Sequence, residues 1–116
     1  MDYFEISHAS RTITWRLPNR IDRAGAPNFY EHLGHFRWEG MSLILDLSET
    51  QFIDAAGIGI LKASAINCQR HNMRLGLRGI TPSIREILQM AGFLDLYPPM
   101  VRLSPETSRT ALTILV

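Results

Sequence analysis

The sequence predicts a single α/β domain in which crossover helices pack on a sheet of about four to five mostly parallel strands with an antiparallel edge. Three observations support this fold class. The segment Leu43–Leu47 is aliphatic except for Asp46, which is typical of a strand covered on both faces. Helical periodicity follows that segment, and strand and helix patterns then alternate along the chain. The length of 116 residues is enough for one domain with its own core.

The amino-terminal part predicts a strand and a helix. Apolar and polar residues alternate over residues 12–17, which predicts a half-exposed strand at or near a sheet edge, with the antiparallel edge at this end of the chain. Asn19 follows it and suits a left-handed turn. Pro27 suits a first helical turn, and the apolar residues after it predict about three turns of helix. These residues are Phe29, Leu33 and Phe36.

The central part predicts a second helix that begins after Asp54. This carboxylate is placed where it can accept hydrogen bonds from the free N–H groups of the first helical turn. An apolar stripe then predicts packing on the sheet through Ile58, Leu61, Ala65 and Cys68. Gly57 and Gly59 each cost about 1 kcal/mol relative to Ala inside a helix. They therefore predict either close approach of another backbone or partner, or tight helix-on-sheet packing alone.

The next elements are a third strand and a third helix. Alternation over Met73–Leu77 predicts the strand. Thr81 is placed as an N-cap before Pro82, and Gly92 is placed to end the helix. An apolar segment then predicts a return to the core through Phe93, Leu94 and Leu96.

The carboxyl-terminal part predicts a last edge strand around Val101–Leu103. The order Ser104–Glu106 indicates a helix start, so we expect a short helix from there to about the C-terminus, although the apolar ending 114–116 fits helix or strand. The predicted domain is thus 1–116, with its core at about 12–97 and a terminal strand and helix at about 100–116.

Composition excludes several classes of function. Twelve basic and eleven acidic residues give a net charge of +1, which leaves no electrostatic footprint for nucleic acid. Arginines 11, 16, 20 and 23 cluster near the amino end, and solvated charges explain them better than a phosphate-binding patch. No apolar run of about 18 residues could cross a bilayer, and the amino end lacks a signal-peptide pattern. We therefore expect a cytoplasmic protein without direct membrane insertion.

Catalytic and metal-binding patterns are weak. The single cysteine, Cys68, excludes an internal disulfide and is predicted to be a small buried hydrophobe. His32 and His35 share a predicted helix without a nearby glutamate ligand. Asp46 and Asp54 could converge at the top of the sheet, but no nucleophile or glycine-rich phosphate loop accompanies them. We expect no enzyme activity, no cofactor and no metal.

Several segments together resemble the STAS family, the anti-sigma factor antagonists and their relatives. They are Asn19–Asp22, Leu45–Ser48, Phe52–Leu61, Thr81–Leu88 and Ala91–Phe93. The resemblance implies a non-enzymatic regulator that binds a kinase-like anti-sigma factor around the start of the second helix and so frees a sigma factor. The residues that it implies for partner binding are Asp22, Ser48, Asp54, Ala55, Ala56, Gly57, Ile58 and Gly59.

One departure from the family concerns regulation. Members usually carry a serine or threonine just before the glycine, which the cognate kinase phosphorylates, whereas this chain has Ala56 preceded by Ala55. Alanine cannot accept a phosphate, so the domain is expected to be locked in the binding-competent form or regulated elsewhere. Other hydroxyls stay open as phosphosites: Ser48, Thr50, Ser64, Thr81 (better explained as an N-cap) and Ser83. Asn19 is a second departure, because glycine is common there.

The missing hydroxyl favours an alternative role. Some small proteins that resemble this family are cytoplasmic subunits of lipid-trafficking ABC transporters and need no phosphorylatable residue. That role predicts a transporter ATPase as the partner. A subunit of a larger signalling assembly is a third hypothesis, and the sequence leaves a homodimer open.

Overall fold

The computed structural model describes residues 3–35, 38–93, 101–103 and 111–114. Six strands in this part of the chain form one sheet in the order β1-β2-β4-β6-β8-β7. Their bounds are β1 Tyr3–Ser7, β2 Thr12–Arg16, β4 Ser42–Asp46, β6 Arg74–Arg78, β7 Val101–Leu103 and β8 Ala111–Ile114. The central strands β2, β4 and β6 are parallel, β1 is antiparallel to β2, and β8 is antiparallel to both β6 and β7.

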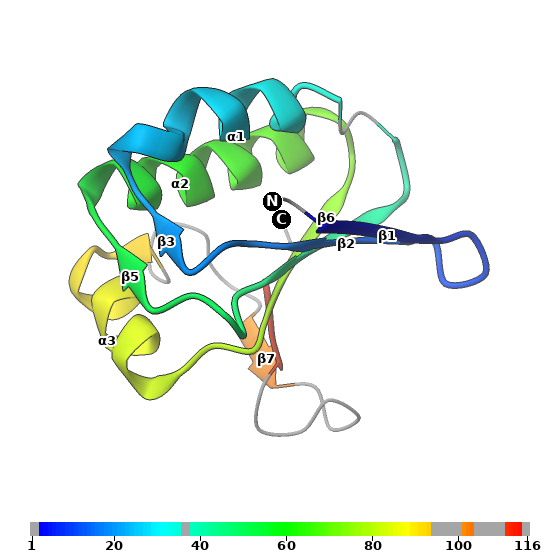
Figure 1. Ribbon diagram of the computed structural model, residues 1–116. Coiled ribbons are helices and arrows are strands. Elements are labelled where there is room, and N and C mark those ends of the chain that lie inside the picture. Colours follow the sequence, from blue (N-terminus) through cyan, green and yellow to red (C-terminus); the bar gives the residue numbers. More distant parts are fainter. Residues whose placement is uncertain (1–2, 36–37, 94–100, 104–110, 115–116) are drawn as a thin grey trace.

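The helices are α1 (Ala26–Leu33), α2 (Ala55–Arg70) and α3 (Pro82–Met90), and a 3₁₀ turn, η1 (Arg23–Gly25), precedes α1. Two short strands, β3 (Arg20–Ile21) and β5 (Phe52–Ile53), form a separate parallel pair. In Figure 1, α1 and α2 lie side by side over one face of the sheet, and α3 lies next to β5. The α2 start is therefore surrounded by β3, β5 and η1.

The core lies between the sheet and the two covering helices. In-register pairing places Ile13 beside Leu43 and Leu43 beside Leu75, so these three side chains form a row across the central strands. Their exposed fraction is 0%. The predicted stripe of α2 packs on this face, and its members are all buried: Ile58, Leu61, Ala65 and Cys68. Burying an aliphatic side chain of this size contributes about 1.5–3 kcal/mol, so this layer is the main source of stability.

The sequence predicted the fold class, the three helices and the central strands, but not the strands β1, β3 and β5. The α/β architecture, the parallel centre and the antiparallel amino-terminal edge are confirmed. Thr81 caps α3 by accepting the N–H of Ile84 at 3.3 Å, and Gly92 ends the helix with a φ of 72°. Phe93 is fully buried. Burial raises the pKa of the Cys68 thiol to about 12, as expected for a small core residue.

Four predictions in the amino-terminal half were wrong. The strand at 12–17 is not half-exposed, because β2 is flanked by both β1 and β4 and its residues 13–15 are all buried. Helix α1 has 8 residues rather than three turns, since it ends at Leu33 before Gly34. His35 consequently lies beyond the helix that was expected to hold it. Asn19 does not have a positive φ, and its carbonyl instead accepts hydrogen bonds from the segment that leads into β5.

The carboxyl-terminal part also differs from the prediction. Val101–Leu103 is an edge strand, as predicted, but Ala111–Ile114 is strand β8 rather than helix. Pairing explains this, because β6 would otherwise present an open edge and β8 supplies its missing partner. The sheet is therefore wider than four to five strands. The predictions for Phe36, Leu94, Leu96 and the helix start at 104–106 lie outside the described residues.

Candidate partner-binding site

Two segments that are distant in sequence meet at the start of α2. Parallel pairing of β3 with β5 places Arg20 beside Phe52 and Ile21 beside Ile53. The pairing is extended by backbone bonds, because the Asn19 carbonyl accepts the N–H of Phe52 at 3.1 Å and the Ile21 carbonyl accepts that of Asp54 at 3.3 Å. The two segments therefore form one continuous part of the surface, next to α2 in Figure 1.

Asp54 fixes this arrangement through its side chain. One carboxylate oxygen, Oδ1, accepts the N–H of Gly57 at 2.8 Å and caps α2, while Oδ2 accepts the N–H of Arg23 at 3.2 Å. Hydrogen bonds from the Gly57, Arg23 and Ala56 N–H groups hold the pKa of this carboxyl below its usual value. The predicted N-cap is confirmed, and the same residue also joins α2 to η1.

Asp22 has a similar local role in the neighbouring segment. Its Oδ1 accepts the N–H of Gly25 at 3.3 Å and caps η1, and its Oδ2 lies 3.3 Å from Nε of Arg20. The side chains of Asp22 and Asp54 thus shape the two turns that border the α2 start.

Gly57 is required by packing. A Cβ at this position would collide with the carbonyl oxygen of Ile21 and would lie 2.8 Å from Cγ2 of Ile53. The expected close approach of another backbone is confirmed at this glycine. At Gly59 no other backbone approaches closely, because a Cβ there would meet only the Tyr30 hydroxyl at 3.8 Å, an ordinary van der Waals contact.

The other predicted residues of α2 differ in exposure. Ala55 is exposed and Ala56 is half-buried, so methyl groups form the outer surface of the first turn. Ile58 is only 8% exposed and belongs to the core cluster, which means that its side chain supports the site from beneath.

Ser48 lies at another place, the end of β4. Its N–H donates to Oδ1 of Asp46 at 2.9 Å, and its Cβ would lie 2.7 Å from a Cβ at Gly79. Asp46 also pairs with Arg78 at 3.3 Å and with Arg16 at 3.6 Å. Although burial opposes ionisation, the Ser48 and Arg78 hydrogen bonds lower the pKa of Asp46. Asp46 and Asp54 therefore have separate sets of partners.

An aromatic side chain that was not predicted from the sequence also lies at this surface. Phe52 and Ile53 are an apolar pair in the sequence, but Phe52 is 40% exposed whereas Ile53 is 5% exposed. The Arg20 guanidinium lies 4.3 Å from the Phe52 ring centroid, a cation–π contact. The period of two in a strand could have indicated that only one member of the pair faces the core.

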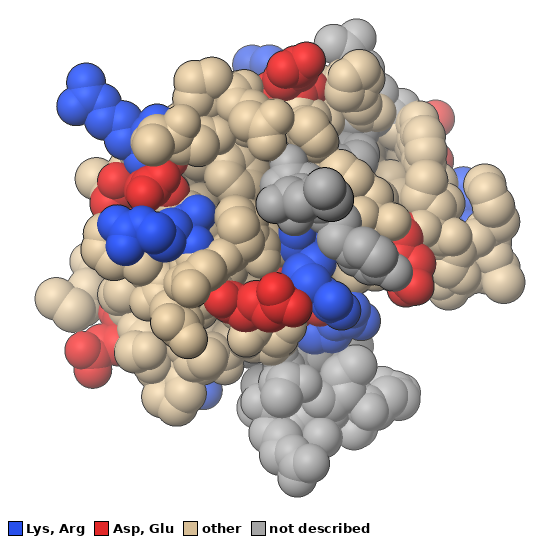
Figure 2. All heavy atoms as spheres, in the orientation of Figure 1, with Lys and Arg blue, Asp and Glu red and all other residues tan. Residues whose placement is uncertain are grey.

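We define the α2-start surface as Arg20, Arg23, Phe52, Ala55 and Ala56. Four of these residues are exposed, and Ala56 is half-buried. Basic and acidic side chains lie next to one another over β3 in Figure 2. Aromatic and arginine side chains around a smooth apolar centre are the composition that is enriched at protein interfaces.

The hydroxyl residues that were considered as alternative phosphosites differ in how deeply they are buried. Thr50 and Ser64 are fully buried, and their hydroxyls donate to the carbonyls of Pro18 and Ile60, each at 2.9 Å. Thr81 serves as the cap of α3. Ser48 and Ser83 are exposed, so they are the members of the predicted set that a kinase could reach.

The comparisons with known proteins agree with this architecture. The STAS domain model matches residues 3–108. The chain belongs to the STAS domain family. Within its described residues, no cluster of three or more His, Cys, Asp or Glu side chains could hold a metal ion, and no helix is long and apolar enough to cross a membrane. No curated protein matches the chain.

Several solved structures share the fold at low sequence identity. A sulfate transporter family protein from Wolinella succinogenes superposes with a TM-score of 0.66 at 19% identity, covering 74% of this chain and 70% of that one. The anti-sigma factor antagonist SpoIIAA in its unphosphorylated form gives 0.62 at 17% identity, covering 91% and 92%. An anti-sigma factor antagonist from Mycobacterium paratuberculosis gives 0.66 at 21% identity, covering 84% and 82%. These similarities establish the fold.

Proposed function

We propose that this STAS domain is a non-enzymatic anti-sigma factor antagonist of the cytoplasm. In this proposal, the α2-start surface binds a kinase-like anti-sigma factor and thereby frees a sigma factor. The observation that carries the proposal is the two-segment arrangement in which Asp54 caps α2 and holds the N–H of Arg23, with Ala55 and Ala56 at the surface between them. Antagonists among the solved structures with this fold support it.

Ala56 determines how such a protein would be regulated. A phosphate at this position would add about 1.5 to 2 negative charges beside the ionised Asp54. Because Ala56 has no hydroxyl, we propose that the α2 start stays permanently in the state that binds its partner. Phosphorylation at the α2 start itself could then not control partner binding.

The test is affinity capture of the chain from its native cytoplasm, with mass spectrometry to identify the partner and an Ala56→Asp variant in parallel. Ala56 is the second residue of α2, where a carboxylate is favourable to the helix dipole, so the variant is expected to fold. Recovery of a kinase-like anti-sigma factor with the wild type, and its loss with Ala56→Asp, would support the proposal and the surface together.

A matched control is available at α3. Ser83 is the second residue of that helix and is exposed, so Ser83→Asp adds the same charge at the same helical position. The antagonist proposal expects Ser83→Asp to retain the partner. Loss of the partner with Ser83→Asp alone would place the contact on α3 instead.

A second candidate function is a STAS subunit of a lipid-trafficking ABC transporter. Ala56 favours it, because such a subunit needs no phosphorylatable residue, and a transporter family protein shares the fold. Under this hypothesis the captured partner is a transporter ATPase. A third candidate, a subunit of a larger signalling assembly, would instead give a high-mass particle by light scattering.

A further inference from the structure

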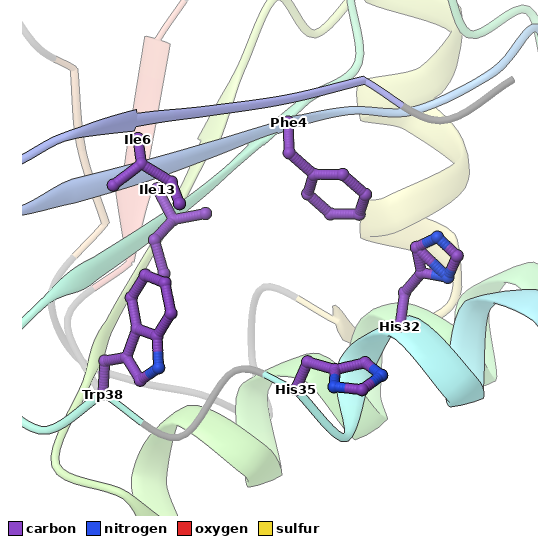
Figure 3. Close-up of a pocket in the computed structure, with 6 residues that line it drawn as sticks. All are labelled: Phe4, Ile6, Ile13, His32, His35 and Trp38. Carbon is purple, nitrogen blue, oxygen red and sulfur yellow. The ribbon is translucent and has the colours of Figure 1, made fainter.

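The face of the sheet that the helices cover is open at one corner. Because α1 ends at Leu33, the apolar side chains of β1 and β2 extend beyond the helix. A pocket of about 250 Å³ opens there, away from the α2 start. Figure 3 shows the six residues that line it: Phe4, Ile6, Ile13, His32, His35 and Trp38.

Near-parallel rings form one wall of this pocket. The rings of Phe4 and His32 stack with centroids 5.2 Å apart and planes 16° apart. Trp15 stacks with Phe4 at 5.3 Å and with His32 at 6.1 Å. In Figure 3, Trp38 lies across the pocket from Phe4, on the side of the two isoleucines. The pocket therefore has aromatic surfaces on opposite sides.

The mouth of the pocket exposes large apolar side chains. Ile6 is 45% exposed and Trp38 is 41% exposed. Large apolar side chains that are exposed next to one another are typical of a ligand-binding or interaction surface. The volume suits one or two fused rings, because pockets for drug-sized ligands begin at about 300 Å³.

The lining of the pocket is almost wholly apolar, and the imidazole of His35 lies at its exposed rim. His35 is exposed, and Figure 3 shows its ring on the α1 side of the pocket, opposite Phe4. The Nδ1–H of His32 donates to the Asn28 carbonyl at 3.1 Å, which fixes the orientation of its ring. None of the six described lining residues carries a carboxylate, so a ligand with an acidic group matches the pocket better than one with an ammonium group.

We propose that this pocket binds a small planar aromatic carboxylate. The ring system would lie between Trp38 and Phe4, where offset aromatic contacts add to the apolar burial. The carboxylate would stay in solvent at the rim, where it would accept a hydrogen bond from the imidazole of His35. This site is separate from the α2-start surface and does not depend on the identity of the protein partner.

The experiment is a titration of the purified full chain with 2-naphthoate, followed by NMR. The two tryptophans of the chain both report on the site, since Trp38 lines the pocket and Trp15 stacks behind its wall. We expect saturable shifts of the Trp38 indole N–H and of the Ile6 and Ile13 methyl groups, with a dissociation constant between about 10 μM and 1 mM. Decahydro-2-naphthoate, which has the same charge but no planar ring, should bind at least about fivefold more weakly.

Substitutions locate the site and its polar group. His35→Ala should weaken 2-naphthoate about tenfold while changing binding of the neutral 2-naphthamide by less than about twofold. Ile6→Ser should weaken both ligands at least about threefold. Ile66→Ser is the matched control, because Ile66 has a similar exposed fraction, 43%, and lies on α2 outside the pocket.

Several results would overturn the proposal. They are the absence of saturable shifts up to the solubility limit, shifts centred at Ala55 and Ala56, equal weakening by Ile66→Ser, and tighter binding of the non-planar ligand. Shifts of the same residues on adding a captured protein partner, with none from 2-naphthoate, would assign the pocket to that protein and would also overturn it.

Discussion

The starts of α2 and α3 begin from the same local signal but have different consequences. Asp54 caps α2 through the N–H of Gly57 at 2.8 Å, and Thr81 caps α3 through that of Ile84 at 3.3 Å. The side-chain contacts of Thr81 stay within its own segment, whereas Asp54 also holds the N–H of Arg23. An N-cap can therefore also join a helix to a distant segment and so build a surface.

The largest expected effect comes from Gly57→Ala. The new Cβ would collide with the backbone carbonyl of Ile21, which cannot move without disturbing the β3–β5 pair. Overpacking of this kind should lower the free energy of unfolding by about 2–3 kcal/mol, measured by urea denaturation. A loss below about 0.5 kcal/mol would contradict the rigid packing that we assign to the α2 start.

The next effect compares the two caps. Thr81→Ala should lower the free energy of unfolding by about 1 kcal/mol. Asp54→Ala should lower the melting temperature further, because it removes the bonds to both Gly57 and Arg23. In Asp54→Asn the Oδ1 acceptor can remain while the amide cannot accept the N–H of Arg23, so an intermediate melting temperature is expected. Equal melting temperatures for Asp54→Ala and Thr81→Ala would contradict the additional role of Asp54 in holding η1.

The variants Asp54→Ala and Thr81→Ala should also differ in the pH dependence of their melting temperatures. The pKa of Asp54 is lower in the folded protein than its ordinary value of 3.8. The contribution of ionised Asp54 to folding stability is therefore complete above the ordinary value and is lost as the pH falls through the folded pKa. The difference in melting temperature between wild type and Asp54→Ala should shrink below about pH 4, whereas that for Thr81→Ala should stay constant, because threonine does not titrate. Asp46 is present in the wild type and in both variants, so its own contribution to the pH dependence cancels in these differences.

These comparisons also explain what the sequence could predict. The caps at Asp54 and Thr81 and the stripe of α2 depend on neighbours in the sequence, and the structure confirms them. The contact of Gly57 with Ile21 and the exposure of Phe52 depend on the β3–β5 pairing, which joins residues more than 30 positions apart. Strand β8 likewise depends on its partner β6. Local patterns therefore predicted the helices α2 and α3 and their caps, whereas long-range pairing determined the α2-start surface and strand β8.

The smallest expected effect comes from Gly59→Ala. This glycine has room for a methyl group, since its Cβ would meet only the Tyr30 hydroxyl at 3.8 Å. The higher helix propensity of alanine should raise the free energy of unfolding by about 0.5–1 kcal/mol, again measured by urea denaturation. A loss similar to that of Gly57→Ala would mean that the whole first turn, rather than Gly57 alone, is tightly packed.

The most direct test of the α2-start surface is the affinity of the captured partner for Ala56→Asp and Ser83→Asp, measured by calorimetry with purified proteins. Both changes place a carboxylate at the second residue of a capped helix. Our account predicts that Ala56→Asp weakens binding at least about thirtyfold, because the charge would be buried against the partner beside Asp54, and that Ser83→Asp changes it less than about twofold. Unchanged affinity of a correctly folded Ala56→Asp variant would contradict the account.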